Sequence, residues 1–140
     1  MKTSRIKGII AGSFDLIHPG YIKMFEDAKK NACNYLIIAL QTDPTVERPN
    51  KCKPVQSADD REYILRSIRY IDEVVRYTTE LELLKILETY DYDIRVIGSD
   101  YSKKSGFTGS NINKQIYFHK RDHNYSLTGL KKKIIKMGVS

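Results

Sequence analysis

The sequence has 140 residues, of which 41% are hydrophobic and 10% aromatic, so it suits one domain over 1–140 rather than a disordered chain. A net charge of +7 favours an anionic partner, such as a nucleotide, a phosphorylated metabolite or a nucleic acid. No apolar run approaches the roughly 20 residues of a membrane span, and the apolar run 8–11 is too short for a signal peptide, so we expect a cytoplasmic protein without a membrane partner.

The first half of the chain alternates apolar and amphipathic segments. Residues 6–11 predict a buried strand, 20–30 a helix and 35–40 a second buried strand. Residues 41–56 form a polar loop with three prolines, too long for a simple connection. Its length indicates a functional role.

The second half continues the alternation. Ser57 begins a helix that runs through the segment REYILRSIRYI, because Ser57 and Asp60 have capping-box spacing. The remaining segments are a strand at 73–78, a helix at 80–90, a strand at 93–98, a polar loop at 99–114, a strand at 115–120 and a helix at 126–137.

Five strands separated mostly by helices predict an α/β fold, a doubly wound parallel sheet with helices on both faces. The ligand site of such a sheet lies beyond the carboxyl ends of the strands. Four polar segments follow strand ends, and the sequence therefore predicts that they gather at that edge: 12–19, 41–56, 99–114 and 120–125.

The turn after the first strand suits phosphate binding. Gly12 allows close backbone approach, Ser13 offers a hydroxyl and an N–H, and the next helix points its N-terminal N–H groups at the same place. His18 lies at the start of that helix, where it can donate to an anion. The spacing matches neither G-x-G-x-x-G nor a Walker loop, so an ordinary βα turn remains the alternative.

Residues 12–30, GSFDLIHPGYIKMFEDAKK, resemble the signature G-[TS]-F-D-x-x-H-x-G-H of cytidylyltransferase-like nucleotidyltransferases. Other segments resemble those of glycerol-3-phosphate cytidylyltransferases and of sugar-phosphate adenylyltransferases. They are KCKPVQSADDRE, RSIRYIDEVV, VIGSDY and KRDHNYSLTGLKKKI. The likeness extends along nearly the whole chain.

The resemblance implies a Rossmann-like sheet of order 3-2-1-4-5 and transfer of CMP, or AMP, to a small phosphorylated alcohol or sugar such as glycerol 3-phosphate. An acceptor phosphate oxygen attacks the α-phosphate of the nucleoside triphosphate and pyrophosphate leaves, with Mg²⁺ bridging phosphates. No metal site on the protein itself is expected, because histidines and cysteines lack metal-ligand spacing. Relatives of this kind are often homodimers, which we expect here as well.

The resemblance also implies residue roles. His18, Lys53 and Arg121 match groups that stabilise the reacting phosphates, and further positions match the nucleotide site: Gly12, Ser13, Phe14, Tyr21, Gly98, Asp100, Tyr125, Ser126 and Thr128. Ser126 also suits the N-cap of the last helix, and both roles can hold together.

The acceptor side has four matching positions, each with a simpler alternative. Lys51, like Lys53, lies in a basic loop that can equally be solvated, and Arg61 can be an exposed helix arginine. Asp15 and Asp43 can bind acceptor hydroxyls or form turns.

One signature position departs from the family pattern. The second histidine is Tyr21, whose neutral hydroxyl donates a hydrogen bond but carries no charge at pH 7. Tyr21 can substitute for the imidazole, mark a different acceptor, or leave a protein that binds nucleotides with impaired catalysis. A smaller departure is Leu127, where a hydroxyl residue is usual.

Three further groups of residues are expected to have no role in the site. Lys131, Lys132 and Lys133 are read as a solvated helix face rather than a nucleic-acid patch, so no nucleic-acid partner is expected. His119 and His123 match no family role and are read as ordinary strand or surface histidines. Both cysteines are expected to be reduced thiols.

Overall fold

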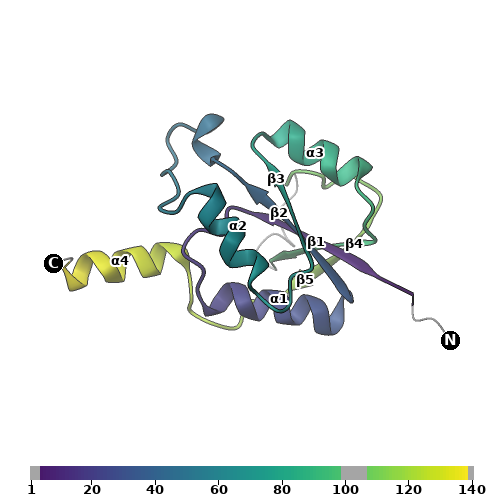
Figure 1. The fold of residues 1–140 in the computed structure, drawn as a ribbon, viewed down its shortest axis with the longest axis horizontal. Coiled ribbons are helices and arrows are strands. Elements are labelled where there is room, and N and C mark those ends of the chain that lie inside the picture. The colour runs from purple at the N-terminus through teal and green to yellow at the C-terminus, as the bar shows by residue number, and fades with distance from the viewer. Residues whose placement is uncertain (1–3, 99–106, 139–140) are drawn as a thin grey trace.

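A single parallel sheet forms the centre of the computed structural model, which describes residues 4–98 and 107–138 (Figure 1). Its strands lie in the order β3-β2-β1-β4-β5, and every neighbouring pair is parallel. The bounds are β1 (Lys7–Gly12), β2 (Tyr35–Gln41), β3 (Glu73–Tyr77), β4 (Ile94–Gly98) and β5 (Gln115–His119). The expected strand order is therefore confirmed.

The helices follow the predicted sequence positions. They are α1 (Pro19–Asn31), α2 (Ala58–Arg66), α3 (Glu80–Thr89) and α4 (Leu127–Met137), and a 3₁₀ turn, η1 (Pro44–Val46), lies within the first long loop. Helix α2 ends earlier than predicted. The Ser67 hydroxyl donates to the Tyr63 carbonyl, and i→i+3 hydrogen bonds over 64–71 tighten the chain so that it turns into β3.

Both faces of the sheet are covered, as predicted. Phe25 of α1 and Leu65 of α2 are fully buried in one cluster with alternate strand residues such as Ile38. Leu83 and Leu87 of α3 pack in a second cluster on the opposite face. Because the central strands are buried on both sides, they are continuous apolar runs.

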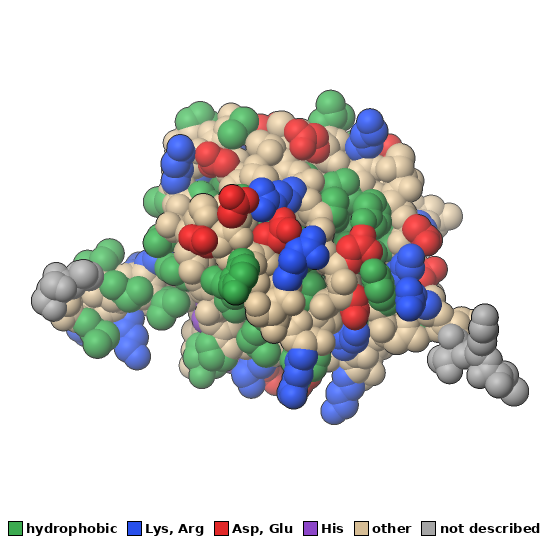
Figure 2. Space-filling model, in the orientation of Figure 1, with side chains coloured by type: hydrophobic (Ala, Val, Ile, Leu, Met, Phe, Trp, Pro, Cys, Tyr) green, Lys and Arg blue, Asp and Glu red, His purple; other side chains and the backbone are tan. Residues whose placement is uncertain are grey.

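Helix α4 departs from this layered arrangement. It projects away from the sheet, and none of its residues is buried (Figure 1). Figure 2 shows apolar and basic side chains exposed along it, and Ile135 and Met137 are 76% and 75% exposed. Among the described helices, none has the length and apolar character that a membrane crossing requires.

Arg61 of α2 joins the loops at the carboxyl edge of the sheet. Its side chain is 1% exposed, and Nε donates to the Gln56 carbonyl at 3.0 Å. One terminal nitrogen donates to the carbonyls of Ser13 at 2.8 Å and Gln41 at 2.7 Å. The other donates to the carbonyl of Thr42 at 2.5 Å. Neither expectation for Arg61 matches the structure. The side chain is not exposed, and N–H groups that were expected to bind an acceptor phosphate donate to protein carbonyls instead.

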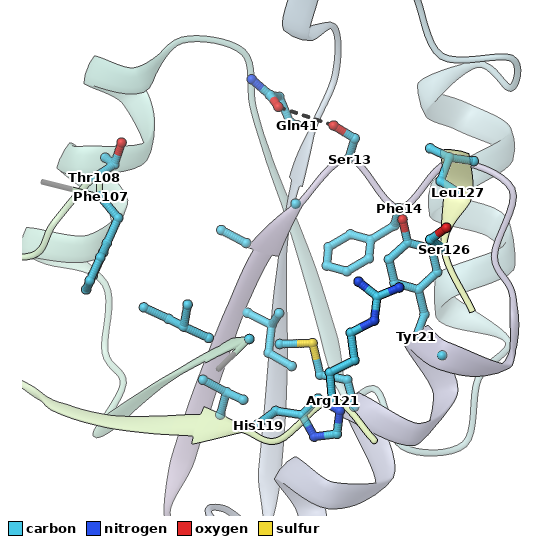
Figure 3. A pocket seen from close by; sticks show the side chains of 18 of the residues that line it. Ser13, Phe14, Tyr21, Gln41, Phe107, Thr108, His119, Arg121, Ser126 and Leu127 are labelled. Carbon is cyan, nitrogen blue, oxygen red and sulfur yellow. Dashed lines mark hydrogen bonds between the residues drawn. The ribbon is translucent and has the colours of Figure 1, made fainter. Parts of the chain in front are cut away.

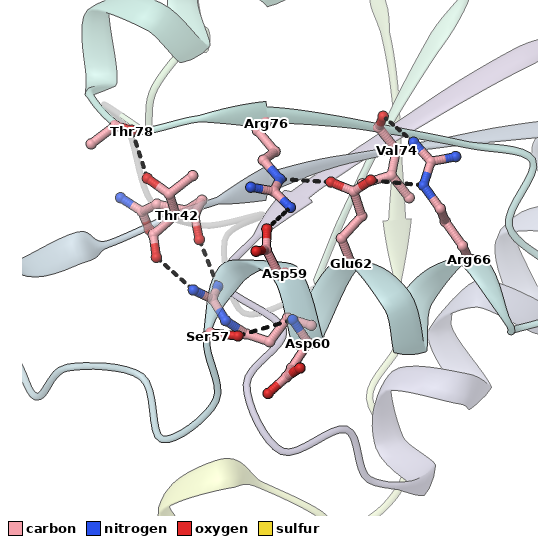
Figure 4. A network of polar contacts seen from close by, with 11 residues as sticks. Thr42, Ser57, Asp59, Asp60, Glu62, Arg66, Val74, Arg76 and Thr78 are labelled. Atoms are coloured by element: carbon pink, nitrogen blue, oxygen red, sulfur yellow. Dashed lines mark hydrogen bonds and ion pairs between the residues drawn. The ribbon is translucent and has the colours of Figure 1, made fainter.

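An ion-pair network holds α2 against β3 (Figure 4). Arg76 of β3 binds Asp59 at 2.7 Å and Glu62 at 2.6 Å, and Glu62 also accepts from Arg66 at 2.8 Å. Ser57 caps the helix as predicted, since its hydroxyl accepts from the Asp60 N–H at 3.0 Å. These contacts fix the position of α2, the helix that carries Arg61, relative to β3.

We expect Arg61→Gln to destabilise the fold by about 3–5 kcal/mol, because several buried carbonyls lose a charged donor at once. Urea denaturation of both proteins measures the difference. Arg69→Gln is the matched control, since Arg69 lies exposed beside the Tyr70 hydroxyl. A loss of less than about 1 kcal/mol for Arg61→Gln would show that the loops are held by other contacts.

Candidate functional site

A cavity of about 680 Å³ opens at the carboxyl edge of the sheet (Figure 3). The turn after β1, the start of α1, the end of β4 and the segment between β5 and α4 contribute to its wall. Phe107 and Thr108 line the side opposite Arg121 and Ser126. The residues expected at the reacting phosphates or the nucleotide that line this cavity are Gly12, Ser13, Phe14, His18, Tyr21, Gly98, Arg121, Tyr125 and Ser126, and Lys51 from the acceptor side lines it too.

The turn after β1 has an unusual backbone. Phe14 and Leu16 adopt positive φ angles of 49° and 50°, a left-handed conformation that costs of order 1 kcal/mol or more at a non-glycine residue. Asp15, between them, is 2% exposed and accepts the N–H groups of Val55 at 2.8 Å and Gln56 at 3.0 Å. The carboxylate therefore holds the strained turn against the long loop.

His18 caps α1. Its Nδ1 accepts a hydrogen bond from the Gly20 N–H at 3.0 Å, so the proton of the neutral ring lies on Nε2. Burial lowers the pKa of His18, and the charges of His123 and Arg121 lower that pKa further. Because protonation would also remove the Nδ1 acceptor, the cap requires the neutral imidazole.

Tyr21 stacks on His18, with ring centroids 4.2 Å apart. Burial raises the pKa of Tyr21, and Asp15 raises that pKa further, so the hydroxyl stays neutral at pH 7. The Tyr125 ring is nearly parallel to the His18 ring, with centroids 6.2 Å apart. Position 21 thus offers a neutral hydroxyl and an aromatic wall to the cavity.

Arg121 and Ser126 lie where the chain enters α4. Arg121 lines the cavity and donates to the Tyr125 carbonyl. The Ser126 hydroxyl accepts from the Gly129 N–H at 2.9 Å, which confirms the capping role predicted for it. Ser13 also lines the cavity, and its hydroxyl donates to Gln41 at 3.2 Å.

A second cavity of about 410 Å³ lies between the loop 41–56 and α4. It shares part of its lining with the first cavity, and the shared residues are Ser13, Gln41, Arg48, Lys51 and Leu127. Thr128, expected at the nucleotide, lines this second cavity instead. Lys131 and Lys132 line it too, so part of the predicted solvated helix face meets a cavity.

The acceptor-side lysines differ in position. Lys51 lines both cavities, whereas Lys53 lines neither, is 78% exposed and lies 3.8 Å from Asp43. Asp43 accepts from the Thr45 N–H at 2.9 Å and caps η1. It therefore forms a turn, which was the simpler of the two roles expected for it. Asp15 is likewise committed to backbone N–H groups, and Asp100 lies outside the described residues.

Two histidines given no role from the sequence line the first cavity. His119 is 7% exposed, with Nδ1 2.7 Å from Asp27 of α1. His123 packs beside Gly20 at the start of α1. His119 ends β5 and His123 lies in the loop 120–125 predicted to lie at this edge, and this position was the one signal available from the sequence.

The described carboxylates around the cavities do not form a metal centre. Within 4–98 and 107–138, no group of three or more histidine, cysteine or acidic side chains could hold a metal ion. Both cysteine thiols are free, as expected. Hydrogen-bond donors and cations dominate the arrangement, which suits the binding of an anion with several oxygens.

Comparison with known proteins identifies the family of this chain. Residues 9–136 match the sequence model of the family described as cytidylyltransferase-like. Glycerol-3-phosphate cytidylyltransferase of Bacillus subtilis is 32% identical over 91% of this chain and 96% of its own length. FAD synthase of Thermococcus kodakarensis is 32% identical over 71% of this chain, and the bifunctional protein HldE of Gluconacetobacter diazotrophicus is 38% identical over 67%.

The FAD synthase and HldE are longer than this chain. The matched part of this chain spans 66% of the FAD synthase and 19% of HldE. Among solved structures, a lipopolysaccharide core biosynthesis protein from Thermoplasma volcanium superposes with a TM-score of 0.66 and 19% identity, covering 87% of this chain and all of its own. At that identity the similarity supports the fold alone.

The lowered pKa of His18 predicts a pH dependence of stability. The pKa of His18 in the folded protein lies below the ordinary imidazole value of 6.5, so the stability that the neutral ring contributes is fully present above pH 6.5 and is lost as pH falls through the folded-state pKa. His18→Asn keeps a capping acceptor that does not titrate. The wild-type protein should therefore lose more unfolding free energy than His18→Asn between pH 7.5 and 5.5, as measured by urea denaturation. Equal losses would mean that His18 does not titrate this way.

Proposed function

This chain belongs to the cytidylyltransferase-like family, and from that premise we propose that it is a nucleotidyltransferase that transfers CMP, or AMP, to a small phosphorylated alcohol or sugar. The observation that carries the proposal is the pair of joined cavities at the edge of the sheet. Glycerol 3-phosphate is the first acceptor to test and CTP the first nucleotide, because the cytidylyltransferase relative aligns over nearly the full length of both chains.

The larger cavity suits the nucleotide. The N-terminal turn of α1 lies at this cavity, where the helix dipole favours an anion, and His18 and Arg121 add an imidazole N–H and a guanidinium. We place the triphosphate against these groups and the turn at Gly12–Phe14, with Gly98, Tyr125 and Ser126 completing the wall. Asp100 remains a candidate contact for the sugar or the base.

The smaller cavity suits the acceptor. Arg48, Lys51, Lys131 and Lys132 bring positive charge to it, and Asp15 already accepts two backbone N–H groups and lies 3.9 Å from Lys131. This charge favours an acceptor that is anionic along its length and disfavours a phosphate ester that carries a cationic amine.

The reaction needs no covalent intermediate on the protein. A phosphate oxygen of the acceptor forms a bond to the α-phosphorus, and the bond from that phosphorus to the bridging oxygen of pyrophosphate breaks. Lys51 lines both cavities, so it can contact the attacking phosphate and the α-phosphate together. Donors around the triphosphate then stabilise the charge that develops on the leaving pyrophosphate.

Mg²⁺ fits this site as part of the nucleotide substrate. The described part of the chain offers no cluster of metal-ligating side chains, so the triphosphate oxygens themselves are the ligands available to the ion. The ion would offset phosphate charge, while the protein side chains orient the two substrates.

Nucleotide binding with impaired catalysis is the second candidate function. Tyr21 favours it, because a buried neutral phenol donates more weakly than an imidazolium. The two candidates differ in turnover and agree in binding, so kinetics separates them.

We further propose a homodimer in the cytoplasm, with neither a nucleic acid nor a membrane as partner. The exposed apolar side chains of α4, including Ile135 and Met137, are the surface that best suits a second copy of the chain. Light scattering of the purified protein measures the oligomeric state.

Turnover is the direct test of the proposed function. With Mg²⁺, pyrophosphatase and CTP, ATP or GTP, we expect phosphate release with a phosphorylated acceptor and the highest kcat/KM with CTP. Glycerol 3-phosphate, sugar 1-phosphates and phosphoethanolamine form the acceptor series, and the cationic phosphoethanolamine should react slowest. Binding of a nucleotide without turnover by any pair would favour the second candidate.

Lys51 and Lys53 provide a matched comparison for the acceptor site. We expect Lys51→Ala to lower kcat/KM for the acceptor by roughly 10²-fold, because it removes a cation that lines both cavities. Lys53→Ala should change it by less than about 3-fold, since an exposed ion pair contributes little. The reverse ranking would contradict this placement of the acceptor.

A further inference from the structure

Two imidazole rings meet at the start of α1. A Cβ atom built on Gly20 would lie 2.6 Å from Cε1 of His123 and 2.8 Å from Cε1 of His18. Both rings therefore pack closely against the glycine, although His18 is the N-cap of α1 and His123 lies in the segment between β5 and α4. Any larger side chain at position 20 would displace them.

Backbone hydrogen bonds give both rings the same tautomer. Nδ1 of His18 accepts from the Gly20 N–H at 3.0 Å, and Nδ1 of His123 accepts from the Tyr125 N–H at 3.1 Å. The proton of each neutral ring must then lie on Nε2, where it is free to donate. Burial lowers the pKa of both histidines, so both are neutral donors at pH 7.

Aromatic contacts hold the rings in place. Tyr21, His18 and Tyr125 stack in succession, with centroid distances of 4.2 Å and 6.2 Å, and His123 lies 5.6 Å from Tyr125. All four side chains line the larger cavity. The arrangement presents His18 and His123 to that cavity, which His119 also lines, although the signature position Tyr21 contributes no imidazole.

We propose that His123 is a phosphate-binding residue that acts as a pair with His18 and supplies the imidazole missing at Tyr21. Nε2–H of each ring donates to phosphoryl oxygens of the nucleoside triphosphate at the N-terminus of α1. The two donors stabilise the charge that develops as the bond to pyrophosphate breaks, and Arg121 adds a formal positive charge nearby. This inference rests on the proposed function of the cavity.

Two substitutions separate phosphate binding from a merely structural role. His123→Asn keeps an acceptor for the Tyr125 N–H but removes Nε2, whereas His123→Gln places an amide donor near the Nε2 position. We expect His123→Asn to lower kcat/KM for the nucleotide roughly 10²-fold and His123→Gln to lower it by about 10-fold, both with a melting temperature close to wild type. Asn124→Ala, in the same segment and lining neither cavity, is the control.

The decisive experiment combines two positions. Tyr21→His should raise kcat at least about 10-fold in the His123→Asn background and less than about 3-fold in the wild-type background, because one imidazole replaces the other. Equal effects in the two backgrounds, or full activity of His123→Asn, would overturn the inference.

Failure of the proposed function has a different result. If the wild-type protein shows no turnover, the catalytic proposal fails, and calorimetry with the Mg²⁺–CTP complex still tests the pair. If His123→Asn binds the complex about 10-fold more weakly than Asn124→Ala does, the histidine pair binds the triphosphate even without catalysis. Equal binding by the two variants would overturn the inference. A wild-type protein that binds no triphosphate overturns both proposals.

Discussion

The guanidinium of Arg61 is the constraint on which the rest of the site depends. It is buried without a direct ion pair among the described residues, and it reaches carbonyls after β1, after β2 and before α2. Burial lowers the pKa of Arg61, and the charge of Asp15 opposes that shift. Arginine suits this position because its planar fork holds several donors in fixed directions, so one side chain joins the turn after β1 to both ends of the loop between β2 and α2.

The loops held in this way create a site with an uneven charge. Asp15 is occupied by backbone N–H groups, and Arg48 lies 3.6 Å from Glu80. Lys51 and Lys132 have no ion pair among the described residues, so their charge remains available to an anion. The strained turn at Phe14 is compatible with such a site, because positive φ angles persist where the surroundings enforce them.

Much of the fold could be predicted from the sequence because its signals are local or periodic. Apolar runs identified the five strands, and the spacing of Ser57 and Asp60 identified the start of α2. The end of α2 at Arg66 was missed, since the tight turn after it depends on where β3 must begin. The projection of α4 was also missed, because its amphipathic pattern says nothing about what covers the apolar side.

The sequence by itself determined the family and the tyrosine at the second signature position, Tyr21, and it predicted a phosphate-binding role for the turn after β1, since these depend on residues close together in the chain. Tertiary structure decided which side chains meet. It buried Arg61, directed Lys51 rather than Lys53 to the cavities, and brought His123 beside Gly20. Such contacts join residues far apart along the chain, and they depend on how each loop packs, which no local pattern of residue types encodes.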